Sequence, residues 1–242
     1  MLRRHIPNSI TSMNLLCGLI GVIFAFRARL DLAFLLMLAA AVCDFLDGFA
    51  ARLLKAYSAL GKELDSLADM VSFGVLPSVM MYQTMRICTW SDALWCYIPL
   101  LIAVFSALRL AKVNLDERQG ENFLGLATPA SAMLCGSLCY HIAVDPDSFL
   151  TVWAGGYLFL PLLSLALCAL LVCEIPMFSL KIKKGQPRSL QSKRICFAAC
   201  VCIIGLFVLL LKLDWSLAVL LSLVAYVLMN LIFRIFAPLT AE

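Results

Sequence analysis

The chain has 242 residues, of which 63% are hydrophobic and only 14% are charged. A water-soluble domain of this size has too little interior to bury so much apolar surface, so the composition excludes a soluble enzyme or a soluble binding domain. The formal net charge of +4 is modest. From the apolar composition we expect an all-α protein, a polytopic transmembrane helical bundle with the lipid bilayer as its solvent.

About eight apolar runs follow one another along the chain, each near the length that a membrane-spanning helix needs. They cover residues 8–26, 30–52, 64–86, 93–111, 127–143, 149–173, 195–211 and 214–236. The basic start Met1–His5 resembles the beginning of a signal peptide, but no A-x-A cleavage site follows it, so the first run is interpreted as a membrane helix. Residues 1–242 are expected to form one membrane domain.

Lys and Arg are distributed unevenly between the two sides of this predicted bundle. With the N-terminus in the cytoplasm, only Arg27, Arg29, Arg86 and Lys212 of the 19 Lys and Arg residues fall on the outer side. The positive-inside rule therefore predicts that both termini are cytoplasmic. The same rule explains the basic loop at 181–194, and because no aromatic residues interleave its charges, we do not expect nucleic acid as a partner.

Cysteine is frequent, with 11 residues scattered singly or at helical spacing, for example Cys135 and Cys139. The odd number, the lack of a CxxC pair and the presence of only two histidines argue against a disulfide framework and against zinc. We expect these cysteines to be small packing residues.

Four acidic residues stand out because they lie at the predicted cytoplasmic ends of two consecutive spans: Asp44, Asp47, Asp65 and Asp69. The spacings are i,i+3 and i,i+4, so each pair shares one face of a helix, and the short turn at 52–61 can bring the pairs together. Clustered carboxylates need shared protons or bound cations, and an all-oxygen ligand set favours Mg²⁺ or Mn²⁺. The alternative is that these acids are interfacial charges neutralised by Arg52, Lys55 and Lys62.

The residues around the acids form a longer pattern. Residues 44–52 read DFLDGFAAR, eight residues follow, and residues 61–69 read GKELDSLAD. This matches D-x-x-D-G-x-x-A-R-x(8)-G-x-x-x-D-x-x-x-D at every fixed position. The chain thus resembles the CDP-alcohol phosphotransferases, which displace CMP from a CDP-linked donor with an alcohol.

The resemblance implies roles for the residues of the pattern. Asp44, Asp47, Asp65 and Asp69 would hold two metal ions, and Asp69 would also be the general base that takes the proton of the attacking hydroxyl. Donor-binding residues would be Asn8, Thr11, Gly48, Ala51, Arg52, Ser58 and Gly61. The small side chains at 48 and 51 leave room for a nucleotide, and Arg52 can bind phosphate oxygens.

Three further segments resemble those of phosphatidylserine synthases, within the same family: residues 6–18, 108–114 and 123–130. Lys112, Val113 and Ala127 depart from the pattern of those enzymes, which have Arg, Phe and Pro there. Basic residues at 109 and 112 suit an acceptor that carries a carboxylate, so Arg109 and Lys112 are the candidate serine-binding residues. The alternative for both is anchoring of the helix end by positive charge.

The resemblance as a whole implies transfer of the phosphatidyl group from CDP-diacylglycerol to the hydroxyl of L-serine, in a homodimer. A six-helix core would occupy residues 1–173, and residues 174–242 would add two helices. The active site would face the cytoplasm of a bacterial or archaeal inner membrane. Two other functions stay open: glycerol 3-phosphate or inositol phosphate as acceptor, which would need a denser basic cluster, and divalent-cation transport, which would need polar groups towards the outer face.

Overall fold

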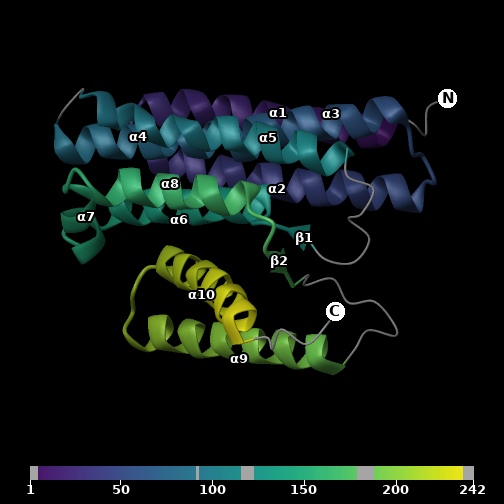
Figure 1. Ribbon diagram of the computed structural model, residues 1–242. Coiled ribbons are helices and arrows are strands. Elements are labelled where there is room, and N and C mark those ends of the chain that lie inside the picture. The colour runs from purple at the N-terminus through teal and green to yellow at the C-terminus, as the bar shows by residue number, and fades with distance from the viewer. Residues whose placement is uncertain (1–4, 91–92, 116–122, 179–187, 237–242) are drawn as a thin grey trace.

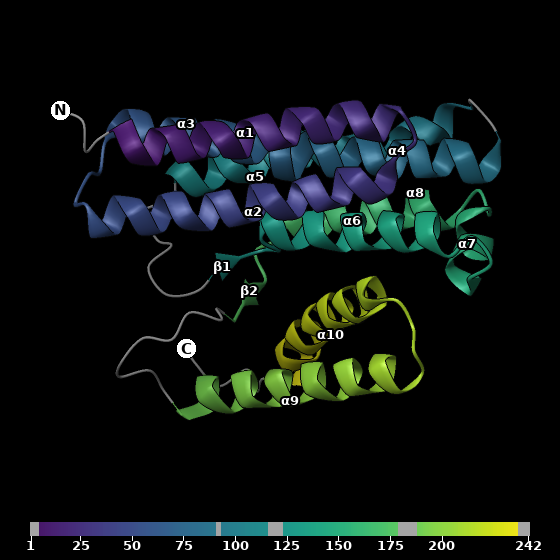
Figure 2. The same cartoon turned by 180° about the vertical axis from the view of Figure 1, so that it is seen from behind.

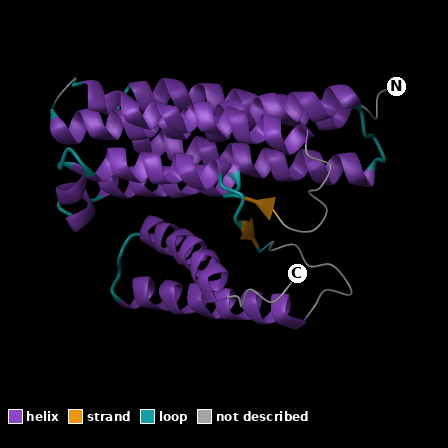
Figure 3. Cartoon of the chain, in the orientation of Figure 1, coloured by secondary structure: helices purple, strands orange, loops and turns teal. Residues whose placement is uncertain are grey.

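The computed structural model describes residues 5–90, 93–115, 123–178 and 188–236, and most of these residues are helical (Figures 1 and 3). In chain order, the elements are α1 (His5–Phe26), α2 (Leu30–Leu53), α3 (Ala59–Asp69), η2 (Met70–Val75), α4 (Leu76–Thr89), η3 (Leu94–Leu100), α5 (Leu101–Leu115), β1 (Phe123–Leu124), α6 (Thr128–Val144), α7 (Phe149–Ala154), α8 (Phe159–Val172), β2 (Pro176–Met177), α9 (Arg188–Leu210) and α10 (Trp215–Phe236). The π-helical turn η2 joins α3 and α4 into one continuous helix. The predicted helical fold is confirmed.

Six helices in the described part of the chain are long and apolar enough to cross a membrane, so the chain is an integral membrane protein. They are His5–Phe26, Leu30–Leu53, Ala59–Thr89, Leu94–Leu115, Gln191–Leu210 and Trp215–Arg234. The other two expected spans are shorter. The expected span 127–143 is α6, with 17 residues, and the expected span 149–173 is divided at Gly155 and Gly156 into α7 and α8, with 6 and 14 residues. The expected count of eight is therefore not confirmed.

The beginning of α1, the end of α2 and the beginning of α3 lie at the same end of the bundle (Figures 1 and 2). A short turn between α2 and α3 produces this arrangement. The amide of Ala56 donates to the carbonyl of Ala51 at 3.0 Å. Ser58 then caps α3, because its hydroxyl oxygen accepts from the amide of Gly61 at 3.0 Å. The turn reverses the chain, so that the acids of α2 and α3 are carried to one end of the bundle.

Helix α1 packs unusually closely against the helix that carries the second pair of acids. A Cβ atom at Gly18 would lie 2.4 Å from the Oγ atom of Ser72 in η2. The Ser72 hydroxyl donates to the carbonyl of Asn14 at 3.0 Å, which fixes the two helices to each other. Only glycine permits this approach. The contact sets which face of α1 is turned towards Asp69, the residue directly before η2.

The C-terminal helices α9 and α10 form a hairpin that adds to the bundle at α6 (Figure 2). The Trp215 ring of α10 packs on Tyr140 of α6 and Phe34 of α2, with centroid distances of 5.1 and 5.8 Å. The hairpin also holds the segment after β2, because Asn230 Oδ1 accepts from the Phe178 amide at 2.9 Å. Strand β2 in turn pairs with β1, which precedes α6.

The cysteines are distributed between the core and the periphery, and all 11 are free thiols. Cys96, Cys135, Cys139 and Cys168 are buried in the bundle, as expected of small packing residues. Cys196 and Cys202 are exposed on α9, which has few neighbours besides α10, so the packing interpretation does not extend to them.

Candidate active site

Three of the four predicted acids come together at the end of the bundle. One carboxylate oxygen from each of Asp44, Asp47 and Asp65 lies within 4.8 Å of the other two. The i,i+3 spacing on α2 and the reversing turn before α3 account for this convergence. Asp69 lies one helical turn further along α3, outside this group of three, and still interacts electrostatically with Asp44 and Asp65.

Side chains from α1 position two of these acids. The Thr11 hydroxyl lies 2.6 Å from Asp47 Oδ2 and donates to it. Asn14, one turn further along α1 and fully buried, directs its amide nitrogen to Asp69 Oδ1 at 3.4 Å. Thr11 and Asn14 share one face of α1, the face that the Gly18 contact turns inwards. Helix α1 therefore supplies a supporting layer for acids that belong to α2 and α3.

The acidic group has the chemical properties of a site for a hard cation. Its donors are all oxygens, which Mg²⁺ and Mn²⁺ prefer. In the described part of the chain, Asp65 Oδ1 is buried without a hydrogen-bond partner, as is Asn14 Oδ1 next to Asp69. Buried acceptors without partners are rare in folded proteins, and a bound cation would satisfy the carboxylate. The residues therefore fit the divalent metal that the sequence predicts.

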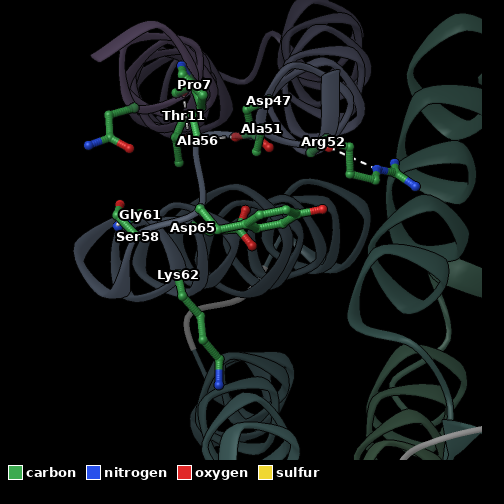
Figure 4. A pocket seen from close by; sticks show the side chains of 13 residues that line it. Pro7, Thr11, Asp47, Ala51, Arg52, Ala56, Ser58, Gly61, Lys62 and Asp65 are labelled. Carbon is green, nitrogen blue, oxygen red and sulfur yellow. Dashed lines mark hydrogen bonds between the residues drawn. The ribbon is translucent and has the colours of Figure 1, made fainter. Parts of the chain in front are cut away.

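A pocket of about 330 Å³ opens beside these acids, lined by the beginning of α1, the end of α2, the turn and α3 (Figure 4). All the predicted donor-binding residues line it: Asn8, Thr11, Gly48, Ala51, Arg52, Ser58 and Gly61. Asp47 and Asp65 also line it, so the pocket and the acidic group are continuous. The predicted donor-binding residues thus line one cavity, of the size that small-molecule sites usually have.

Four lining residues were not predicted: Pro7, Ala56, Tyr57 and Lys62. Pro7 precedes the predicted Asn8, and Ala56 and Tyr57 lie in the turn whose sequence the pattern leaves free. Figure 4 shows the Lys62 side chain extending away from the carboxylates of Asp47 and Asp65. The signal that could have identified Pro7 is its position four residues before Thr11, on the same face of α1.

The two glycines of the pattern differ in the reason for their small size. A Cβ atom at Gly61 would lie 3.0 Å from Ser58 Oγ and 3.1 Å from Asn8 Oδ1, so a larger residue would crowd the turn and the beginning of α1. A Cβ atom at Gly48 would have the Arg52 side chain as its nearest neighbour, at 3.9 Å. Packing within the chain therefore does not require glycine at 48. Gly48 lines the pocket, where the absence of a side chain leaves space.

Two of the predicted donor-binding residues also have structural roles. Ser58 is the N-cap of α3, and this capping role alone would account for a serine at this position. Arg52 Nε donates to the carbonyl of Gly48 at 2.9 Å, so this guanidinium is held along the end of α2. Arg52 also lines the pocket, and its remaining N–H groups can bind phosphate oxygens.

The two candidate acceptor residues lie in different environments. Arg109 is 7% exposed, its Nη1 donates to Thr128 Oγ1 at 3.0 Å, and it interacts electrostatically with Asp69. Lys112, one turn further along α5, is half exposed and forms an ion pair of 2.9 Å with Glu174. The structure therefore associates Arg109, but not Lys112, with Asp69.

The sequence interpretation also missed polar residues that connect helices at the site. Asn14 is one, and Asn114 is another, since its amide donates to Ser66 Oγ at 2.9 Å and ties α5 to α3 beside Asp65. The available signal is a carboxamide on a predicted membrane helix. In a membrane helix such a group needs a partner on a neighbouring helix.

Comparison with known proteins agrees with the family resemblance of the sequence. The family model described as CDP-alcohol phosphatidyltransferase matches residues 4–172. A protein of Mycobacterium tuberculosis named CDP-diacylglycerol--serine O-phosphatidyltransferase is 34% identical over 207 residues, which are 81% of this chain and 70% of that protein. A protein of the same name from Bacillus subtilis is 35% identical over 129 residues, 53% of this chain and 72% of that protein. An archaetidylserine synthase of Methanothermobacter thermautotrophicus is 31% identical over 134 residues, 54% of this chain and 56% of that protein.

Proposed function

Because this chain belongs to the CDP-alcohol phosphatidyltransferase family, we propose that it transfers the phosphatidyl group of CDP-diacylglycerol to the hydroxyl of L-serine, giving phosphatidylserine and CMP. The observation that carries this proposal is the continuity between the acidic group and the pocket on one side, and the electrostatic interaction of Asp69 with buried Arg109 on the other. A nucleotide diphosphate and a small carboxylate-bearing acceptor would meet between them. The bacterial relatives named above support serine as the acceptor.

On the donor side, the pocket would hold the cytidine diphosphate. Gly48 and Ala51 leave the face of α2 free of bulky side chains, and Arg52 would bind phosphate oxygens. Thr11 holds the Asp47 carboxylate in a fixed orientation through its hydrogen bond. Asp44, Asp47, Asp65 and Asp69 would hold two divalent cations, Mg²⁺ or Mn²⁺, and when bound these would supply stabilisation of charge on the diphosphate oxygens and the leaving CMP.

On the acceptor side, Arg109 would bind the carboxylate of serine. The serine hydroxyl attacks the β-phosphorus of CDP-diacylglycerol, its proton passes to a carboxylate oxygen of Asp69, and the bond from phosphorus to the bridging oxygen breaks. CMP leaves with that electron pair. Asp69 suits the base role because Asn14 holds it one turn beyond the group of three acids, towards Arg109. Lys112 would have to release Glu174 in order to bind the acceptor.

We further propose that residues 1–173 form a six-helix core and that residues 174–242 add two membrane helices, which gives eight spans with α6 and α8 among them. The range of the family match supports this division. Both termini and the acids would face the cytoplasm of a bacterial or archaeal inner membrane, because the end of the bundle with the acids also carries Arg52, Lys55 and Lys62. The family resemblance supports a homodimer.

The proposed acceptor can be tested directly with purified protein, CDP-diacylglycerol and Mg²⁺ or Mn²⁺, by following CMP release with a panel of alcohols. L-Serine is expected to accelerate CMP release, and glycerol 3-phosphate and inositol phosphate are not, because their phosphate groups need more positive charge than Arg109 supplies. A reaction without acceptor measures hydrolysis. Turnover with glycerol 3-phosphate and none with serine would refute serine as the acceptor and leave the family assignment intact.

The proposed orientation predicts that the two ends of the bundle are labelled from opposite sides of the membrane. Leu115 at the end of α5 is 85% exposed, and Asp147 lies exposed between α6 and α7. In a cysteine-free background that retains activity, an impermeant maleimide should label Leu115→Cys only from the cytoplasmic side and Asp147→Cys only from the outer side. Labelling of both from the same side would contradict the proposed orientation.

A further inference from the structure

Five buried side-chain atoms have no hydrogen-bond partner in the part of the chain that the structure describes: Asn14 Oδ1, Asp65 Oδ1, Ser106 Oγ, Arg109 Nε and Ser131 Oγ. The first two belong to the acidic site. The other three lie on α5 and α6. Buried polar atoms without partners are costly and uncommon, so three of them in neighbouring helices need an explanation.

These three atoms belong to one cluster. Ser106 and Arg109 are three residues apart on α5 and share a face of that helix, and Thr128 and Ser131 have the same relation on α6. The hydrogen bond from Arg109 Nη1 to Thr128 Oγ1, 3.0 Å long, turns the two faces towards each other. Ser106, Thr128 and Ser131 are completely buried, and Arg109 is 7% exposed.

The cluster lies beside the reacting end of α3. A Cβ atom at Gly74 of η2 would lie 3.2 Å from Ser106 Cβ, so α5 is in direct contact with the turn that follows Asp69. Helix α6 also contacts η2, and Arg109 interacts electrostatically with Asp69. The residues that line the donor pocket come from α1, α2, α3 and the turn between α2 and α3. The cluster therefore lies next to the helix segment that follows Asp69, on helices that do not line the donor pocket.

The two unpaired serines differ from other buried serines of α6 and α8. A buried serine in a membrane helix usually donates to a backbone carbonyl in the preceding turn. Ser137 on α6 does so with Leu134 at 3.2 Å, and Ser164 on α8 does so with Leu160 at 2.7 Å. Ser106 and Ser131 do not. Their hydroxyl groups remain available for a ligand.

The chemistry of the cluster selects the ligand. The Arg109 guanidinium is permanently charged and its Nε is a donor, and each serine hydroxyl can donate one further hydrogen bond. Several donors around a buried cation suit a carboxylate. We propose that Ser106 and Ser131 bind the carboxylate of the acceptor together with Arg109, and that Thr128 positions the guanidinium. This inference rests on the proposed transfer to serine and names two specificity residues for it.

Steady-state kinetics with L-serine and CDP-diacylglycerol can test this subsite. Ser106→Ala and Ser131→Ala are each expected to raise the KM for serine about 10-fold to 100-fold, the effect of a lost hydrogen bond to a charged group. The KM for CDP-diacylglycerol should change less than threefold, since the donor pocket is untouched. Ser137→Ala is the matched control, because it removes a buried hydroxyl of α6 that is already bonded to the backbone, and its KM for serine should equal that of the wild type.

The outcomes separate this inference from the proposed function. If the wild type uses serine and the two variants behave like Ser137→Ala, the subsite is refuted and the proposed function stands. If the wild type does not use serine, both are wrong. Should an alanine variant fail to fold, Ser106→Cys and Ser131→Cys preserve the side-chain volume with a weaker donor, and they must show the same selective rise in KM for serine.

Discussion

The Asp69→Asn variant is expected to lose about 10²–10⁴-fold in kcat, the usual contribution of a general base. The substitution keeps the shape of the side chain and an oxygen that can accept from Asn14, so the local packing should persist. What it removes is the carboxylate that takes the proton of the acceptor hydroxyl. Single-turnover measurement of CMP release, with serine and donor both saturating, would report this loss without a contribution from product release.

Donor binding distinguishes this role from that of a metal ligand alone. If Asp69 acts mainly as the base, equilibrium binding of CDP-diacylglycerol in the presence of Mg²⁺ should stay within a fewfold of the wild-type value. Asp31→Asn is a suitable control, since Asp31 lies at the other end of α2 in an ion pair with Arg29. A kcat close to that of the wild type in Asp69→Asn would exclude Asp69 as the base.

The location of the acids could be predicted because it depends on two local features. Spacings of three and four residues place each pair on one helix face. A short turn between the two helices keeps the end of α2 and the beginning of α3 at the same end of the bundle. Gly61, which the sequence pattern fixes, and Ser58, which lies among its eight free positions, build that turn. The local geometry and the sequence pattern therefore place the same residues together, and these residues line the pocket.

The supporting residues could not be predicted, because they depend on how α1 is rotated against its neighbours. The approach of Gly18 to Ser72 decides that rotation, and only then do Thr11 and Asn14 face the acids. No periodicity on an apolar helix such as α1 reveals which polar residue meets which partner. The ion pair between Lys112 and Glu174 similarly joins residues far apart in the sequence, beyond the reach of local patterns.

The number of membrane spans could not be predicted for a different reason, because hydropathy does not show where a helix is interrupted. Hydropathy treats residues 149–173 as one apolar run, since glycine interrupts a helix without interrupting an apolar stretch. The structure ends α7 at Ala154, next to Gly155 and Gly156, and begins α8 at Phe159. Glycine is a poor helix former, and two in succession allow the chain to change direction.

Removing divalent cations is expected to abolish turnover. Three carboxylates within 4.8 Å of one another repel strongly, and Asp65 Oδ1 has no hydrogen-bond partner in the described part of the chain, so the donor diphosphate cannot approach this group without compensating positive charge. EDTA should reduce CMP release to the background rate, and added Mg²⁺ or Mn²⁺ should restore it. Ca²⁺, which is larger and more loosely coordinated, should restore little. Full activity in excess chelator would contradict a metal-dependent mechanism.

The residues around the cation site should show graded effects on the Mg²⁺ concentration required for half-maximal rate. Asp47→Asn removes a ligand charge and should weaken both cation and donor binding, with the largest loss of activity at limiting Mg²⁺. Thr11→Val preserves shape but removes the hydroxyl that donates to Asp47 at 2.6 Å, and loss of such an orienting partner typically costs about 10-fold to 100-fold in metal affinity. Excess Mg²⁺ should therefore largely rescue Thr11→Val. Asp31→Asn, the same chemical change at the opposite end of α2, should leave the Mg²⁺ requirement unchanged. Equal Mg²⁺ requirements in Thr11→Val and the wild type would show that the hydrogen bond does not position a metal ligand, and equal requirements in Asp47→Asn would exclude Asp47 as a ligand.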